Sequence, residues 1–220
     1  MMCRKVKLLA VLALLVISGG VWCQLRTTTP EEFLKKSGIA LDNDSLLRAL
    51  DDNRVGIAAN AATLLAERGI KEAVPAIASK MKAAHDKQLV LTLAQSLNLL
   101  GSSDGTKQLE AFCLGSEVNT GERLRAAYAL VYTKNYSCLP MMPELLLSSH
   151  QDEKLDALLY LLKIPSPQKN APATLGPALL VVATSDPEGK LRALARTIIN
   201  QIGDPATKDA LVRSASAHRH

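Results

Sequence analysis

Apolar residues recur with a helical spacing along most of this chain of 220 residues. The pattern is clearest in three stretches, which begin at Ile57, Leu89 and Leu191. In each stretch, further apolar residues follow four and eight positions on, and a glycine follows twelve positions on. Residues at these offsets share one face of an α-helix, and glycine readily adopts the positive φ that ends a helix. Each stretch is therefore predicted to be an amphipathic helix closed by glycine.

Two further stretches carry the same apolar stripe without the closing glycine. They begin at Leu124 and Leu155, so the five starting positions are 32, 35, 31 and 36 residues apart. After a short turn, each stretch is followed by a second segment expected to be helical, and these segments are 72–82, 105–113, 138–147, 172–183 and 205–213. Pairs repeated at this period are typical of helical-repeat proteins. We predict five helical hairpins, preceded by one or two helices within residues 30–50.

Residues with side chains that can cap a helix precede each predicted first helix. Such side chains accept hydrogen bonds from the free N–H groups of the first turn. The expected caps are Asn53, Asp86, Thr120, Asp152 and Asp186. The fourth hairpin also contains three prolines within residues 165–172, which predict an extended linker between its two helices.

The composition favours an all-α fold. Apolar residues make up 48% of the chain but aromatic residues only 3%, so the core must consist mainly of Leu, Ala, Val and Ile. Such side chains suit close helix packing better than a β-sandwich. We predict a right-handed α-solenoid of about five hairpins over residues 44–213, with an N-terminal segment at 24–43 and a disordered tail at 214–220.

Residues 1–23 have the layout of a secretory signal peptide. Basic residues up to Lys7 precede an uncharged apolar run from Leu8 to Ile17, and small residues follow at 18–20. We therefore expect export to the periplasm or the extracellular space. The alternative is an uncleaved segment that anchors a structural envelope protein, although residues 8–22 are somewhat short for the ~20 residues that span a bilayer.

The charge distribution argues against a nucleic-acid partner. The formal charge is +5, but without residues 1–23 there are 23 basic against 21 acidic residues, which leaves +2. Acidic and basic residues alternate along the chain, whereas a surface for DNA or RNA needs a coherent basic stripe. We expect a protein partner, with membrane contact only through the N-terminal segment if it stays uncleaved.

The sequence contains no motif for catalysis or for binding a cofactor or metal. The HExxH, CxxC, GxSxG and phosphate-loop patterns do not occur. His85 and His150 stand beside predicted helix caps and are interpreted as polar loop residues, and His218 and His220 lie in the predicted tail. We predict no catalytic, cofactor-binding or metal-binding residue.

Two cysteines lie in the predicted repeat region. Cys113 falls late in one predicted second helix, and Cys138 falls at the start of the next. An oxidising compartment would allow them to pair. If the two helices run parallel, however, their Cα atoms lie beyond the ~7 Å limit for a disulfide. We therefore expect them to remain unpaired.

Three tyrosines are the candidate partner-binding residues. Tyr128, Tyr132 and Tyr136 recur every four residues, which places them on one face of a helix. Tyrosine is common in protein interfaces, which favours a binding stripe. Tyr128 and Tyr132 also occupy the offsets of four and eight residues from Leu124, which favours the core. Both interpretations remain open on the sequence.

Motifs in the first and last units resemble the short HEAT-like repeats, the kind also found in phycobilisome lyase proteins. The last unit reads Asp186-Pro187, Leu191-Arg192 and Ile202-Gly203-Asp204-Pro205, and the first has Gly69 followed by Ala73-Val74-Pro75. The resemblance covers about residues 44–213. Tetratricopeptide repeats and ankyrin repeats have similar lengths, but their signatures are absent.

The resemblance implies scaffolding or recognition. We expect an exported scaffold or adaptor, armadillo-like in its helical arrangement, that presents its second helices to a protein partner. Some members of HEAT-like families act on bilins or are hydroxylases, so an enzyme or enzyme subunit of that kind is the alternative. It would require clustered His, Glu or Cys residues on the second helices.

Overall fold

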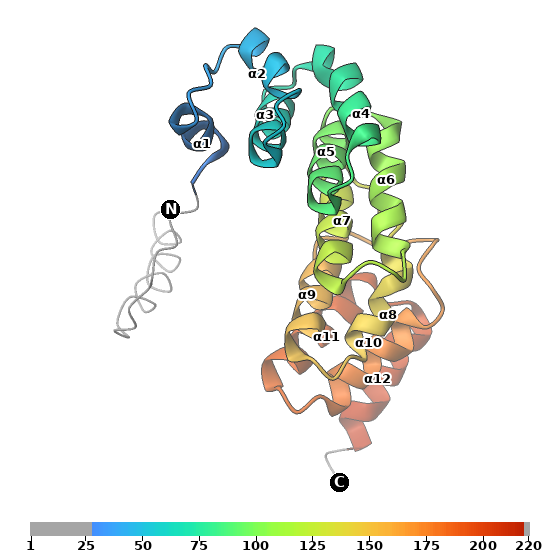
Figure 1. Cartoon of the computed structure of the whole chain (residues 1–220). Helices are drawn as coiled ribbons and strands as arrows, with labels where there is room; N and C mark the ends of the chain where they lie inside the picture. Colours follow the sequence, from blue (N-terminus) through green and yellow to red (C-terminus); the bar gives the residue numbers. More distant parts are fainter. Residues whose placement is uncertain (1–27, 218–220) are drawn as a thin grey trace, which may run out of the picture.

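The computed structural model describes residues 28–217, which form twelve α-helices, two short 3-10 helices and no strand (Figure 1). The all-α prediction is confirmed for this part of the chain. The predicted signal peptide, His218 and His220 lie outside the described residues. No helix within residues 28–217 is both long enough and apolar enough to cross a membrane.

Two short helices precede the repeated units, as predicted. α1 (Pro30–Lys36) and α2 (Asn43–Ala49) both pack against α3 (Val55–Glu67). Each begins at a capping side chain: Thr29 Oγ1 accepts from the N–H of Glu32, and Asp42 Oδ1 accepts from the N–H of Ser45. Their buried leucines, Leu34 and Leu46, cover the outer face of α3 and so close this end of the core.

The five predicted helix pairs are present. The first helices are α3, α5 (Lys87–Leu99), α7 (Thr120–Tyr132), α9 (Gln151–Leu161) and α11 (Gly189–Ile202). The second helices are α4 (Val74–Ala83) after η2 (Lys71–Ala73), α6 (Ser103–Leu114), α8 (Met142–Leu146) after η3 (Leu139–Met141), α10 (Leu175–Ser185) and α12 (Pro205–Ala217). α12 continues past residue 213, so the tail predicted from residue 214 begins too early.

The helices pack mainly on their neighbours in the chain (Figure 1). Each first helix contacts the next one, from α3 through α5, α7 and α9 to α11, and the second helices α8, α10 and α12 also contact one another in order. One buried cluster extends along these contacts from Leu34 to Ile202. It consists mainly of leucine and alanine, as the composition predicts.

The buried stripe begins at different residues than predicted in the third and fourth units. In the first, second and fifth units it starts at Ile57, Leu89 and Leu191, as expected. In α7 it starts two residues before the predicted Leu124, at the buried Glu122, although Leu124 is also buried. In α9 the same offset falls on Glu153, which is only partly buried. Offsets of four and eight from Glu122 reach Ala126 and Leu130, and those from Glu153 reach Ala157 and Leu161; all four are buried. The predicted anchor Leu155 is 40% exposed.

The turns that end the first helices confirm the role of glycine at two positions. Gly69 and Gly101 have φ of +70° and +84°, the left-handed conformation that glycine adopts without strain. Lys134 occupies the equivalent position, twelve residues after Glu122, with φ of +60°. Gly203 differs, because its φ is −64°. A Cβ there would lie 2.4 Å from the carbonyl oxygen of Ile199, so this glycine is needed for space.

Only one of the five predicted first-helix caps is correct. Asp86 caps α5, where its Oδ1 accepts from the N–H of Leu89. Asn53, Thr120, Asp152 and Asp186 are not the capping residues; Arg54, Asn119, His150 and Glu188 hold those positions. Of these four, only Asn119 makes a capping hydrogen bond through its side chain. The shift at α7 and α9 accompanies the earlier start of their buried stripes.

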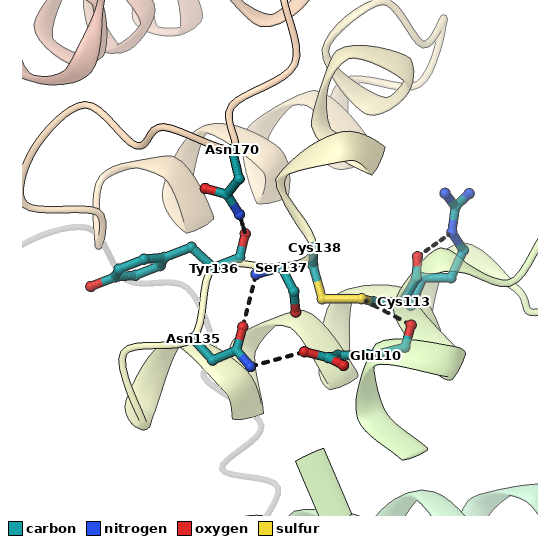
Figure 2. Close-up of a disulfide and its surroundings, with 8 residues drawn as sticks. Glu110, Cys113, Asn135, Tyr136, Ser137, Cys138 and Asn170 are labelled. Atoms are coloured by element: carbon teal, nitrogen blue, oxygen red, sulfur yellow. Dashed lines mark hydrogen bonds between the residues drawn. A yellow bond between two sulfur atoms is a disulfide. The ribbon is translucent and has the colours of Figure 1, made fainter. Parts of the chain in front are cut away.

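Cys113 and Cys138 form a disulfide, so the expectation that they remain unpaired is wrong (Figure 2). Their Cα atoms are 5.8 Å apart. Cys138 immediately precedes η3, which packs against α6, and Cys113 lies one residue before the C-terminal end of α6. The second helix of the third unit therefore starts where α6 ends. It does not lie beside α6 in the parallel arrangement that the prediction assumed.

The chain between α7 and the disulfide is held by side-chain amides (Figure 2). Asn135 Nδ2 donates to Glu110 Oε1 on α6 at 3.0 Å, and Asn135 Oδ1 accepts from the N–H of Ser137 at 2.9 Å. Asn170, in the predicted proline-rich linker, donates from Nδ2 to the carbonyl oxygen of Tyr136 at 3.3 Å. This segment is thus joined to the second and fourth units as well as to its own.

Gly105 in α6 lies against the backbone of α5. A Cβ there would lie 2.5 Å from the backbone N of Asn98 and 2.6 Å from Cβ of Leu97, both on α5. We expect Gly105→Ala to force α5 and α6 apart and to lower the free energy of unfolding by about 1–3 kcal/mol in urea denaturation.

Gly121→Ala is the matched control for that substitution. Gly121 lies in the first turn of α7, and its nearest neighbour would be Asn119 Oδ1 at 3.4 Å, an ordinary contact. Because alanine favours a helix more than glycine does, this variant should be stabilised by up to about 1 kcal/mol. Equal effects of the two substitutions would contradict the close packing described at Gly105.

Candidate binding groove between α5 and α7

A groove of about 430 Å³ lies between the first helices α5 and α7. Two of its lining residues on each helix lie six and ten positions after the start of the buried stripe: Gln95 and Leu99 on α5, Tyr128 and Tyr132 on α7. These offsets turn side chains away from the stripe. The other lining residues are Asn98, Arg125, Ala129 and Thr133.

The rim of the groove is apolar and exposed. Tyr132 is 75% exposed and Leu99 is 54% exposed, although both are large apolar side chains. On the next first helix, α9, Leu155 and Leu159 are also exposed. Comparable apolar side chains are exposed elsewhere, at Val55, Leu114, Leu147, Val181 and Val212. Leu99 and Tyr132 differ from them because both line one groove, and large exposed apolar groups mark interaction sites when they gather.

The floor of the groove is held by Asn98, which is buried. Its Nδ2 donates to the carbonyl oxygen of Ala129 at 3.1 Å and to Thr133 Oγ1 at 3.2 Å, both of which belong to the α7 side. Its Oδ1 accepts from Thr106 Oγ1 on α6 at 2.9 Å. One amide therefore joins α5, α6 and the end of α7. The sequence pattern does not single out Asn98, whose only signal is a polar residue within an apolar run.

Tyr128 forms the inner wall of the groove. Its ring meets that of Tyr160 edge to face, with centroids 5.8 Å apart, and its hydroxyl donates to the carbonyl oxygen of Asp156 at 3.0 Å. Burial, followed by the nearby charge of Asp156, raises the pKa of Tyr128 to about 12. The hydroxyl therefore stays protonated at neutral pH and remains a hydrogen-bond donor that connects α7 to α9.

The three predicted tyrosines do not share one face. Tyr132 is not a core residue, because the buried stripe of α7 starts at Glu122 and turns Tyr132 towards solvent. Tyr136 lies beyond the end of α7 and packs against the core. The structure thus brings Tyr128 and Tyr132 together in the groove and separates Tyr136 from them.

Two cations lie beside the groove. Arg125 donates from Nη1 to Gln88 Oε1 and from Nη2 to Gln95 Oε1, so neutral amides on α5 hold its guanidinium. Lys163 Nζ lies 5.8 Å from the ring centroids of both Tyr128 and Tyr132, which is within the range of cation–π attraction. None of the eight lining residues carries a carboxylate.

The histidines of the described region lie away from this groove. His85 is exposed and lies just before α5. His150 is also exposed and is the N-cap residue of α9, where its backbone N–H donates to Ser148 Oγ at 3.1 Å. Among residues 28–217, no three His, Cys, Asp or Glu side chains are grouped so that they could hold a metal ion. Both histidines occupy polar loop positions, as the sequence predicts.

No protein-family model matches this chain, and no curated protein matches it either. The resemblance to HEAT-like repeats therefore depends on the motifs in the sequence. The groove is interpreted from its own geometry and chemistry.

Proposed function

We propose that this chain is an exported α-solenoid scaffold, similar to HEAT-repeat proteins, that binds a protein partner through the groove between α5 and α7. The observation that carries the proposal is the pair Leu99 and Tyr132, two large apolar side chains exposed on opposite sides of one groove. Tyrosine supplies a large contact area together with a polar end, and it is enriched in protein interfaces.

The repeated burial pattern supports the solenoid part of the proposal. First helices pack on first helices in chain order, and in every unit the residues at offsets four and eight are buried in the core. In such an array each unit contacts mainly its neighbours, which leaves an elongated surface for recognition. The disulfide and the layout of residues 1–23 support export, because disulfides persist mainly in oxidising compartments.

The proposed surface differs from the one expected from the sequence. Second helices were expected to face the partner, whereas the groove and its exposed tyrosine belong to first helices. The floor at Asn98 makes this surface well suited to binding, because hydrogen bonds to α6 and α7 fix the distance between the two walls. A rigid, preformed site loses less conformational entropy when it binds.

Tyr132→Ala tests this proposal directly. We expect the variant to bind the partner about tenfold more weakly or worse, as is usual for a central aromatic side chain in an interface. Because Tyr132 is 75% exposed, the free energy of unfolding should change by less than about 0.5 kcal/mol. A photo-crosslinking side chain placed at position 132 in the purified chain, with an extract of the source cells, would capture the partner for titration.

Val212→Ala is the matched control, because Val212 is also exposed but lies on α12, away from the groove. It should leave both binding and stability unchanged, and a crosslinker at position 212 should not capture the same protein. Equal losses of binding in the two variants, or equal crosslinking from the two positions, would contradict the proposal.

A further inference from the structure

We infer that the groove accepts an extended acidic segment of the partner protein, in which carboxylates flank an apolar side chain. The inference rests on the proposed function and adds the chemistry of the partner. Apolar walls at Leu99 and Tyr132 would take the apolar side chain, and the cations Arg125 and Lys163 would take the carboxylates.

Neither cation beside the groove is held by a salt bridge to a described residue, although the charge of Asp156 reaches Tyr128. Within residues 28–217, neither Arg125 nor Lys163 lies at salt-bridge distance from a carboxylate, whereas Arg54, Arg123 and Lys154 each pair with one. The amide oxygens that hold Arg125 are neutral, so they orient the guanidinium and leave its charge available. An arginine has five N–H donors, and the two in use leave others free for a carboxylate.

Lys163 is placed by aromatic rings instead of by an anion. Its Nζ lies 5.8 Å from the ring centroids of both Tyr128 and Tyr132, so the ammonium is shared between the two rings. Cation–π attraction positions the charge without neutralising it. A carboxylate that reaches Lys163 therefore also brings its neighbouring side chains against the exposed ring of Tyr132.

The two cations lie at different places around the groove. Arg125 is on α7 and bonds to side-chain amides of α5, whereas Lys163 lies beside the rings of Tyr128 and Tyr132. Side chains of an extended chain alternate between its two faces, so residues two positions apart point the same way. The expected segment therefore presents an apolar side chain and acidic side chains on both sides of it to the groove.

Selection from a display library of random twelve-residue peptides tests the inference on the purified chain. We expect the retained peptides to be enriched in acidic residues on both sides of an apolar residue. Binding of a synthetic peptide from this set, measured by fluorescence anisotropy, should weaken about three- to thirtyfold in the double variant Arg125→Gln/Lys163→Gln, because exposed ion pairs contribute modestly. Added salt should weaken binding to the original chain more than to this variant.

The other outcomes each overturn the inference in a recognisable way. Peptides that are basic or uncharged, and that depend on Tyr132 but not on the two cations, would overturn the acidic partner and leave the proposed function intact. Peptides whose binding is unaffected by Tyr132→Ala would overturn both. Self-association of the chain that is lost in Tyr132→Ala, measured by sedimentation, would assign the groove to a second copy instead.

Discussion

Reducing the disulfide between Cys113 and Cys138 should lower the free energy of unfolding by about 3.5 kcal/mol. The two cysteines are 25 residues apart in the sequence, and a cross-link that closes a loop of this length restricts the unfolded chain by about that amount. The loop contains the whole of α7, which supplies one wall of the groove. Urea denaturation of the oxidised chain and of the chain in excess reductant measures the difference.

The double variant Cys113→Ala/Cys138→Ala provides the control. It should resemble the reduced chain in stability, apart from the small cost of two shortened buried side chains, and it should not respond to reductant. Any response that persists in this variant would come from a cysteine elsewhere in the chain. Identical denaturation curves for the oxidised and reduced original chain would show that the cross-link does not stabilise the fold.

The loss of the disulfide should also make the α7 wall of the groove less stable. Without it, only noncovalent contacts hold this region on α6: the packing of η3 against α6 and the hydrogen bond from Asn135, which precedes η3, to Glu110. Asn98 still bonds to the end of α7, so the wall is expected to stay in place but to open more often. Partner binding should therefore weaken in reductant, even under conditions where the chain remains folded.

The sequence was sufficient to predict the helix pairs because their apolar spacing is local. Ile57, Leu89 and Leu191 each start a stripe that any amphipathic helix would show, and all three are buried. The glycines that follow two of these stripes, Gly69 and Gly101, have the positive φ expected. Local pattern and tertiary packing agree in these units, so the prediction required no knowledge of distant contacts.

The prediction failed where a charged residue occupies a core position. Glu122 is buried at the start of the stripe in α7, and its carboxylate accepts from Gln88 Nε2 on α5 at 2.6 Å. Gln88 lies 34 residues earlier, so nothing near Glu122 in the sequence indicates that its charge can be buried. Choosing Leu124 instead moved the assumed stripe by two residues. With that shift, Tyr132 fitted a core position as well as a binding stripe, so the sequence left both interpretations open.

The misplaced stripe of α7 also kept the groove from being predicted. Its walls come from offsets six and ten of two helices, and these positions can be identified only once the stripe is placed correctly. Tyr128 and Tyr132 were identified by residue type, but their partners Leu99, Asn98 and Lys163 come from neighbouring units. The disulfide was missed because it depends on η3 starting where α6 ends, which the sequence spacing does not determine.

Asp186 is a second acidic residue that is buried in the core. Lys154 on α9 and Asp186, which precedes α11, form an ion pair of 2.7 Å; the side chain of Asp186 is 1% exposed and that of Lys154 15%. Asp186 Oδ1 also accepts from the N–H of Glu188 at 2.9 Å. We expect Asp186→Asn to lower the free energy of unfolding by about 3 kcal/mol, because it leaves the Lys154 ammonium without a counter-charge in the interior.

The double variant Lys154→Met/Asp186→Asn separates the ion pair from the packing around it. Asparagine keeps an oxygen for the N–H of Glu188, and methionine fills most of the space of lysine without a charge. Replacing a buried pair by neutral groups is often close to neutral for stability, so the double variant should recover most of the loss. If it is no more stable than Asp186→Asn alone, the stabilisation comes from the shape of the side chains and not from their charges.

The dependence of this effect on pH follows from the pKa of Asp186. Burial alone would raise it, but the hydrogen bonds from Lys154 and from the N–H of Glu188 outweigh burial and lower the pKa below its usual value. A carboxyl group whose pKa is lowered by folding stabilises the protein above its unfolded pKa of about 3.9, and this contribution is lost as the pH falls through the folded pKa. The difference in stability between the original chain and Asp186→Asn should therefore be constant near neutral pH and shrink below about pH 4. A difference that shrinks already between pH 7 and pH 5 would show that another group controls the pair.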